Sequence, residues 1–162
     1  MRVISGSCLL LLFAACTGEP PPPPEMTNAE RGEIQAEVLE WSDQFLEAAN
    51  RIDSEGVLAL FDPADGHFVN SGSYWATPQA HRAGTQDLYA GWETWQGEWE
   101  TRRVDVLSPE RALLVGEVVG VMKPVDGGEV DHQTFFSFLL RKEEGVWRGL
   151  FGHVSGNWTP RQ

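Results

Sequence analysis

Apolar residues recur at steps of three and four between residues 29 and 50. The repeat consists of Ile34, Val38, Trp41, Phe45 and Leu46. Positions with this spacing share one face of an α-helix. The pattern therefore predicts an amphipathic helix over 29–50 that covers an apolar surface elsewhere in the chain.

Three shorter elements are predicted next along the chain. They are a helix over 53–61, a strand over 67–75 interrupted by Gly72, and a helix over 85–95 that carries Leu88, Trp92 and Trp95. Asp53 is of a residue type that caps the first turn of a helix. Pro63 disfavours helical backbone in the residue before it, so the second helix ends there.

The second half of the chain is typical of strands. Four are predicted, over 98–107, 111–123, 129–141 and 146–156, with short turns between them. Because helices come first and hairpins follow, we expect one α+β domain over 29–162, in which a curved antiparallel sheet wraps around the N-terminal helices. This segment has the length of one domain with a sizeable core.

Residues 1–15 have the pattern of a secretory signal peptide, with an early positive charge and an apolar run that ends in Ala14 and Ala15. The run is too short to span a bilayer, which takes roughly 20 apolar residues. The sequence up to Cys16 resembles the lipobox of bacterial lipoproteins, and this resemblance implies cleavage before Cys16 and lipidation of that residue. An ordinary signal peptide cleaved near Ala15 is the alternative.

Residues 16–28 are interpreted as the lipidated cysteine and a tether. The five prolines at 20–24 favour an extended conformation that would hold the domain away from the lipid headgroups. Thr17 is not the aspartate that retains lipoproteins at the inner membrane in many Gram-negative bacteria, so we expect the periplasmic face of the outer membrane.

Charge narrows the choice of partners. The formal net charge of −12 disfavours nucleic acid, and it gives no basic patch for binding a lipid surface. Attachment to the membrane would therefore depend on the lipid anchor.

The order of the predicted elements resembles the nuclear-transport-factor-2-like, or SnoaL-like, family over about residues 34–158. The likeness lies in the segment 53–61 leading to Asp65 and Phe68, and in the final segment 147–155. The resemblance implies a cone-shaped α+β fold with a ligand cavity between sheet and helices. That family ranges from ketosteroid isomerases and polyketide cyclases to binding modules, so activity has to be argued from the cavity.

Alternation along the strands predicts which side chains line this cavity. We assume an even number of residues in the turns at Gly127–Gly128 and Glu144–Gly145, which fixes the residues that share a face. The expected ligand-binding residues are Glu117, His132, Thr134, Phe136, Phe138, Phe151 and His153, with Trp92 and Trp95 at the mouth. A mostly apolar lining of this kind indicates a small apolar or aromatic ligand.

Two functions fit that lining. One is non-catalytic binding of the ligand; the other is an enzyme of the isomerase, cyclase or dehydratase type. For the enzyme, the resemblance suggests His153 or Glu117 as the base and Tyr74 or Tyr89 as donor to an oxyanion. Binding is favoured, because Glu117 and His153 would lie two strands, or roughly 10 Å, apart.

Structural roles remain open for the same residues. His153 could bond a backbone carbonyl or Thr134, and Glu117 could pair with Arg102 or Arg103 on a neighbouring strand. For Trp92 and Trp95, packing in the core is favoured over a place at the mouth.

The other histidines suggest no metal site. His67 and His81 lie in expected loops or strand ends, where solvent exposure is usual. His132 lies near a turn and is also expected to be solvated. The four histidines lack the close spacing of a metal site, so neither a metal nor another cofactor is expected.

A homodimer is the last expectation. The face of the sheet opposite the cavity is predicted to carry Leu114, Val118, Phe135, Leu139, Leu150 and Val154. These residues are too apolar for full exposure, so we expect a second copy of the chain to cover them.

Overall fold

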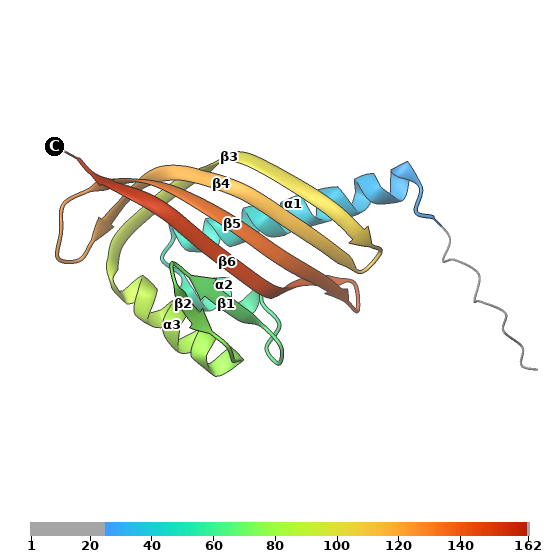
Figure 1. Ribbon diagram of the computed structural model, residues 1–162, viewed down its shortest axis with the longest axis horizontal. Coiled ribbons are helices and arrows are strands. Elements are labelled where there is room, and N and C mark those ends of the chain that lie inside the picture. The colour runs from blue at the N-terminus through green and yellow to red at the C-terminus, as the bar shows by residue number, and fades with distance from the viewer. Residues whose placement is uncertain (1–24, 162) are drawn as a thin grey trace, which may run out of the picture.

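The computed structural model describes residues 25–161. The predicted signal peptide, Cys16 and most of the predicted tether lie outside these residues. The elements are α1 Asn28–Asn50, α2 Ser54–Ala59, β1 His67–Asn70, β2 Ser73–Trp75, α3 Pro78–Ala90, β3 Trp92–Ser108, β4 Arg111–Pro124, β5 Val130–Glu143 and β6 Val146–Pro160 (Figure 1).

The strands form one curved, unclosed sheet of six strands in the order β2-β1-β6-β5-β4-β3. β1 runs parallel to β6, and every other pair is antiparallel. The helices lie against the inner face of the curve, with α1 behind the long strands in the view of Figure 1. The predicted α+β fold, a curved sheet around N-terminal helices, is confirmed. None of the helices between residues 25 and 161 has the length and apolar character needed to span a membrane.

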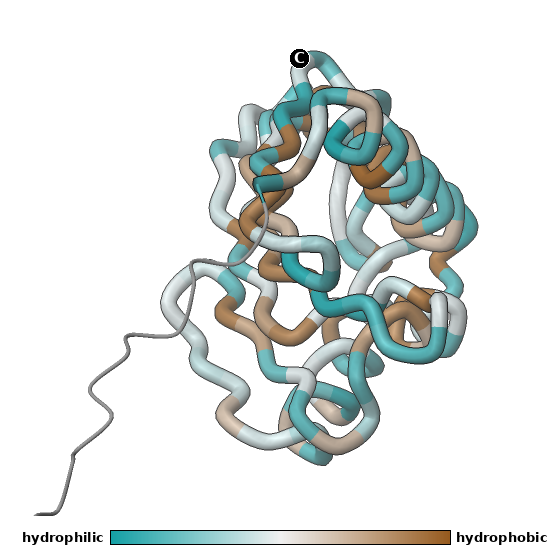
Figure 2. Tube along the Cα trace, turned by 90° about the vertical axis from the view of Figure 1, so that its right-hand side faces the viewer, coloured by the Kyte–Doolittle hydropathy of each residue, from teal (hydrophilic) through white to brown (hydrophobic). Residues whose placement is uncertain are grey.

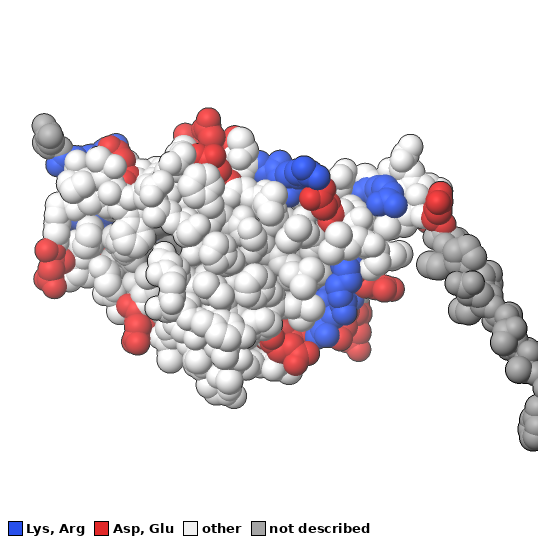
Figure 3. All heavy atoms as spheres, in the orientation of Figure 1, with Lys and Arg blue, Asp and Glu red and all other residues white. Residues whose placement is uncertain are grey.

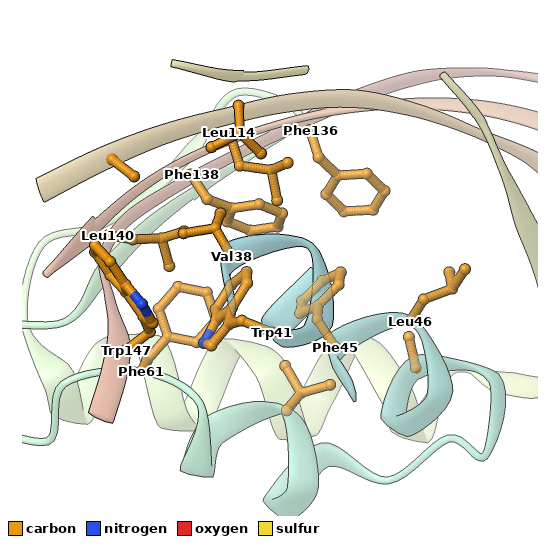
Figure 4. Close-up of a cluster of buried hydrophobic side chains, with 14 of the residues drawn as sticks. Val38, Trp41, Phe45, Leu46, Phe61, Leu114, Phe136, Phe138, Leu140 and Trp147 are labelled. Atoms are coloured by element: carbon orange, nitrogen blue, oxygen red, sulfur yellow. The ribbon is translucent and has the colours of Figure 1, made fainter. Parts of the chain in front are cut away.

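Helix α1 begins and packs as its sequence predicts. The Thr27 side chain accepts a hydrogen bond from the backbone of Glu30, and the Glu30 side chain accepts one from the backbone of Thr27, which closes a capping box. Its apolar face then meets the sheet: the Trp41 ring lies edge-on to Phe138 at 5.2 Å, and Phe45 to Phe138 at 4.9 Å (Figure 4). This aromatic contact fixes α1 across the inner face of β5.

The predicted third helix is wrong in its bounds. Helix α3 begins at Pro78, where the Thr77 hydroxyl caps the first turn, and it ends at Ala90 before Gly91. Trp92 and Trp95, predicted on that helix, lie at the start of β3.

The assumed parity of the β4–β5 connection is also wrong. Five residues, 125–129, join the two strands, and an odd number shifts every partner by one position. Glu117 therefore pairs with Phe135, and Val118 pairs with Thr134. A shift of one residue turns a strand's whole set of side chains to the other face, so Val118 faces the helices and Glu117 faces away.

On β6 a bulge changes the face partway along the strand. The turn between β5 and β6 has two residues, 144–145, as expected. Beyond it, Leu140 pairs with Gly149 on the inner face. The register then shifts at Leu150, so Leu139 pairs with Phe151 and Ser137 with His153. An extra residue in a bulge reverses the alternation beyond it, so Phe151 and His153 lie on the outer face.

The outer face differs accordingly from the predicted one. Leu114 and Val118 are fully buried in the core (Figure 4 labels Leu114), and Val154 lines the inner side of β6. Phe135 does lie outside, with 40% of its surface exposed. Figure 3 shows that the face over β5 and β6 carries its charged side chains mainly at the rim. In Figure 2, at right angles to that view, apolar positions are spread over strands and helices alike.

Candidate functional site

A cavity lies at one end of the molecule, between the inner face of the sheet and α3. Its volume is about 90 Å³. The deep wall comes from the end of α1, with Phe45 and Ala49, and from the strand residues Met122, Thr134 and Phe136. Its mouth lies between the β1–β2 turn and the end of β6, where the lining residues Ser71, Gly156 and Trp158 are exposed.

Two tryptophans flank this mouth. Trp92, at the start of β3, meets the Trp158 ring edge to face, with the ring centroids 6.1 Å apart. Trp158 is 52% exposed. An aromatic pair at an open end provides an apolar surface on which a flat molecule can lie.

Helix α3 supplies a polar stripe to the opposite wall. His81, Thr85 and Tyr89 all line the cavity and are spaced four residues apart. This spacing aligns them along one helix face, with a rise of about 6 Å between neighbours. Among residues 25–161, none of these three side chains has a hydrogen-bond partner. The stripe can therefore bond to a molecule in the cavity.

His81 is the most enclosed of the three, with 3% of its surface exposed. Its ring stacks on Phe68, with centroids 5.3 Å apart, and it meets Phe61 edge to face at 4.8 Å. Burial lowers the pKa of His81 to about 4, and the positive charge of Arg82 acts in the same direction. At neutral pH the imidazole is therefore uncharged and has one donor and one acceptor nitrogen.

Tyr89 adds a phenol that stays protonated. Burial raises the pKa of its hydroxyl, and the nearby negative charge of Asp53 raises it further. Tyr89 therefore offers a hydrogen-bond donor at any physiological pH.

The described lining of the cavity contains no aspartate, glutamate, lysine or arginine. This absence contrasts with the whole chain, which carries a formal net charge of −12. An ion entering the cavity would lose water without gaining an opposite charge, at a cost of several kcal/mol. The cavity is thus suited to an uncharged molecule.

Four of the residues predicted to bind ligand line this cavity: Thr134, Phe136, Trp92 and Trp95. Phe138 is on the predicted face but is fully buried in the core, where it packs against α1.

His132 is on the predicted inner face and supports the cavity wall from behind. It is 3% exposed, and its ring stacks on Trp95 with centroids 4.8 Å apart. Nε2 lies 3.3 Å from the carbonyl oxygen of Gln96, and Nδ1 lies 3.1 Å from the Thr134 hydroxyl. The carbonyl can only accept, so Nε2 carries the proton and Nδ1 accepts from Thr134. The predicted solvation of His132 is wrong, because these two partners hold it under the sheet.

The other predicted residues lie on the outer face of the sheet. Glu117 accepts a hydrogen bond from the Gln133 amide at 2.6 Å and has no ion pair with Arg102 or Arg103 among the described residues. The predicted cavity position of Glu117 is therefore wrong.

His153, Phe151 and Tyr74 are also outside. His153 pairs in register with Val69 of β1 and Ser137 of β5. The Phe151 ring lies 5.3 Å from that of His67, and Tyr74 on β2 is 62% exposed. The prediction that His153 is the histidine of the cavity is wrong; His81 has that place.

His81 was not predicted to line the cavity, because the third helix was predicted to begin at residue 85, whereas α3 begins at Pro78. A usable signal was present: Thr77 and Pro78 form a helix start, and His81, Thr85 and Tyr89 then follow at helical spacing. The predicted exposure of His81 is also wrong.

Metal ligands do not gather in the described structure. No three histidine, cysteine, aspartate or glutamate side chains of residues 25–161 lie close enough together to hold an ion.

Several solved structures share this architecture. A hexachlorocyclohexane dehydrochlorinase from Novosphingobium barchaimii superposes with a TM-score of 0.72 at 14% identity, covering 83% of this chain and 94% of that one. A ketosteroid isomerase-like protein from Erwinia carotovora atroseptica gives a TM-score of 0.69 at 20% identity, covering 75% and 94%. An NTF-2-like protein of unknown function from Shewanella oneidensis gives 0.60 at 16% identity, covering 75% and 98%.

These likenesses show a shared fold. No curated protein sequence matches the chain. A family model described as the SnoaL-like domain matches residues 38–158, which is most of the chain. The protein therefore belongs to the SnoaL-like domain family, within the nuclear-transport-factor-2-like fold.

Proposed function

We propose that this domain binds a small, uncharged, ring-containing molecule in the cavity between α3 and the sheet, while a lipid on Cys16 holds it at the cell envelope. The observation that supports the binding function is the charge-free lining, which contains the buried imidazole of His81 without a hydrogen-bond partner among the described residues. The anchor is supported by the sequence around Cys16 alone.

The size of the cavity supports a ligand built on rings. A dry cavity of about 150 Å³ holds one benzene ring. The cavity here, at about 90 Å³, has room for part of such a ring, and its open mouth lets the rest extend outward against the paired rings of Trp92 and Trp158. The apolar walls would bury the ring faces, and the α3 stripe would bond a polar substituent at the edge.

Catalysis by proton transfer is the second candidate, and one observation favours it. His81 and Tyr89 both line the cavity, so a base and a hydrogen-bond donor face the same space. The names of the similar structures, a dehydrochlorinase and an isomerase-like protein, belong to the same kind of chemistry.

Binding remains the better supported of the two. A base works best when its pKa lies near the working pH, whereas burial lowers the pKa of His81 to about 4. The described lining also contains no carboxylate to stabilise the imidazolium that proton abstraction would create. His81 is therefore better suited to hold a ligand by hydrogen bonding than to remove its proton.

A comparison of two probes with the same ring system tests the binding function. 2-Naphthol is neutral at pH 7, whereas 2-naphthoate is an anion, and both can be followed through tryptophan fluorescence. We expect 2-naphthol to bind at least tenfold more tightly, because the cavity gives the carboxylate no compensating charge. Equal affinity, or tighter binding of 2-naphthoate, would contradict the proposed ligand class.

A further inference from the structure

The mouth of the cavity and the start of the described chain lie at opposite ends of the molecule. Residue 25 precedes the N-terminal end of α1, whereas Ile52, just past the other end of α1, lines the cavity. Figure 1 shows the same separation: the chain leaves α1 at one end of the long axis, and the end of β6, which borders the mouth, is at the other.

The length of α1 sets the scale of this separation. With 23 residues at 1.5 Å per residue, α1 is about 34 Å long. Its first turns are fixed on the sheet, because the Arg31 guanidinium donates to the carbonyl of Val106 at 3.2 Å and the Gln35 amide donates to that of Val104 at 3.2 Å. The departure point of the N-terminal segment is thus held away from the mouth.

The segment between Cys16 and this point is too short to bridge that length. It has nine residues, 17–25, and nine residues span at most about 32 Å when fully extended. To bring the mouth against a bilayer that holds the lipid on Cys16, the segment would have to run back along all of α1 and around the side chains of the domain. Its reach falls short of α1 alone.

From this geometry we infer that the cavity opens away from the membrane that holds the anchor, so that its ligand enters from the aqueous side and not from the bilayer. The inference rests on the proposed function, which supplies both the anchor and the ligand.

Two labelled variants of the acylated, full mature protein test this orientation in phosphatidylcholine vesicles. Asn157→Cys places a thiol on an exposed position of β6 beside the mouth, and Gly32→Cys places one on α1 near the anchor, where an added Cβ meets no atom within 4 Å. A coumarin on each thiol serves as energy donor to rhodamine-labelled lipid in the bilayer.

We expect energy transfer from residue 157 to be at least twofold weaker than transfer from residue 32, because the label lies farther from the bilayer. Equal transfer, or stronger transfer from residue 157, would overturn the orientation. Flotation of the vesicles separates this failure from that of the anchor: protein that does not float lacks the anchor, and the inference then falls with it. 2-Naphthol binding by the same samples reports independently whether the cavity binds its ligand.

Discussion

The imidazole of His81 lies parallel to the ring of Phe68, with centroids 5.3 Å apart and an angle of 11° between the planes. Because of this stacking, the imidazole packs in the core as another aromatic ring would. Its position on α3 also places it in the cavity lining. A histidine held in this way contributes a neutral hydrogen-bonding group to a space that is otherwise largely apolar.

Acid should destabilise the domain through this residue. The pKa of His81 is about 4 in the folded protein and about 6.5 in the unfolded chain. Between these values the unfolded chain binds more protons, so stability falls as the pH is lowered from 6.5 through 4. The full loss is about 3 kcal/mol, which is present below pH 4 and absent above pH 6.5.

His81→Phe should remove this part of the pH dependence, because phenylalanine keeps the stacked ring and has no proton to gain. Urea unfolding at pH 7, 5.5 and 4 measures the effect. His153→Phe, on the outer face, is the matched control and should keep the wild-type dependence. The account would be wrong about His81 if both variants lost stability with acid as the wild type does.

Gly152 should tolerate no side chain. An added Cβ there would overlap the ring of Phe68, which itself supports His81. Gly152→Ala should therefore cost about 1–3 kcal/mol of unfolding free energy and weaken probe binding. Gly32→Ala, in the open on α1, should instead add about 0.5–1 kcal/mol. Chemical denaturation of both variants provides the comparison, and an unchanged stability in Gly152→Ala would speak against the close packing of β6 on Phe68.

Association into a homodimer remains a prediction, with a corrected set of residues. Phe135 is 40% exposed on the outer face of β5, where it lies between Glu117 of β4 and Ser155 of β6. Phe135→Arg should convert a dimer into a monomer by placing a charge in a buried apolar contact. Leu107→Arg, at a 57% exposed position near the β3–β4 turn, should leave the dimer intact. Light scattering at tens of micromolar decides, and a monomeric wild type would end the proposal.

Lipidation is tested at Cys16. Cys16→Ser should abolish acylation and leave the protein unprocessed or in the soluble fraction. Mass spectrometry of the mature N-terminus gives the direct answer for the wild type, and an unmodified Cys16 there would remove the basis for the anchor. Fractionation of the host envelope tests the expected outer-membrane location separately.

The sequence predicted the helices and strands well where the pattern was long. The apolar repeat of α1 located that helix to within a residue at its start, and three of the four long strands begin within a residue of their predicted starts. β3 begins at Trp92, six residues before its predicted start, in a segment predicted to be helical. These signals depend on residues that are close in the sequence, so they can be recognised without knowing which elements pack against one another. The helix start at Thr77 is equally local, and reading it would have placed His81 on α3.

The faces of the strands could not be predicted in the same way. The side of the sheet on which His153 lies depends on one inserted residue, Leu150, and that of Glu117 on an odd-numbered turn after β4. Neither feature has a signature strong enough to identify it from residue types alone. Thr134 and Phe136 lie on the predicted face, because both belong to β5 and the faces of β4 and β6 were assigned relative to that strand.

An uncharged ligand that bonds to the His81 imidazole should lose affinity when this side chain is replaced by an apolar ring. The dissociation constants of 2-naphthol and naphthalene are compared for the wild type, His81→Phe and His153→Phe. Loss of one hydrogen bond, worth about 0.5–1.5 kcal/mol, should raise Kd for 2-naphthol in His81→Phe by roughly 2- to 13-fold, while Kd for naphthalene stays the same and His153→Phe changes neither. Weaker 2-naphthol binding in His153→Phe with no change in His81→Phe would contradict the account.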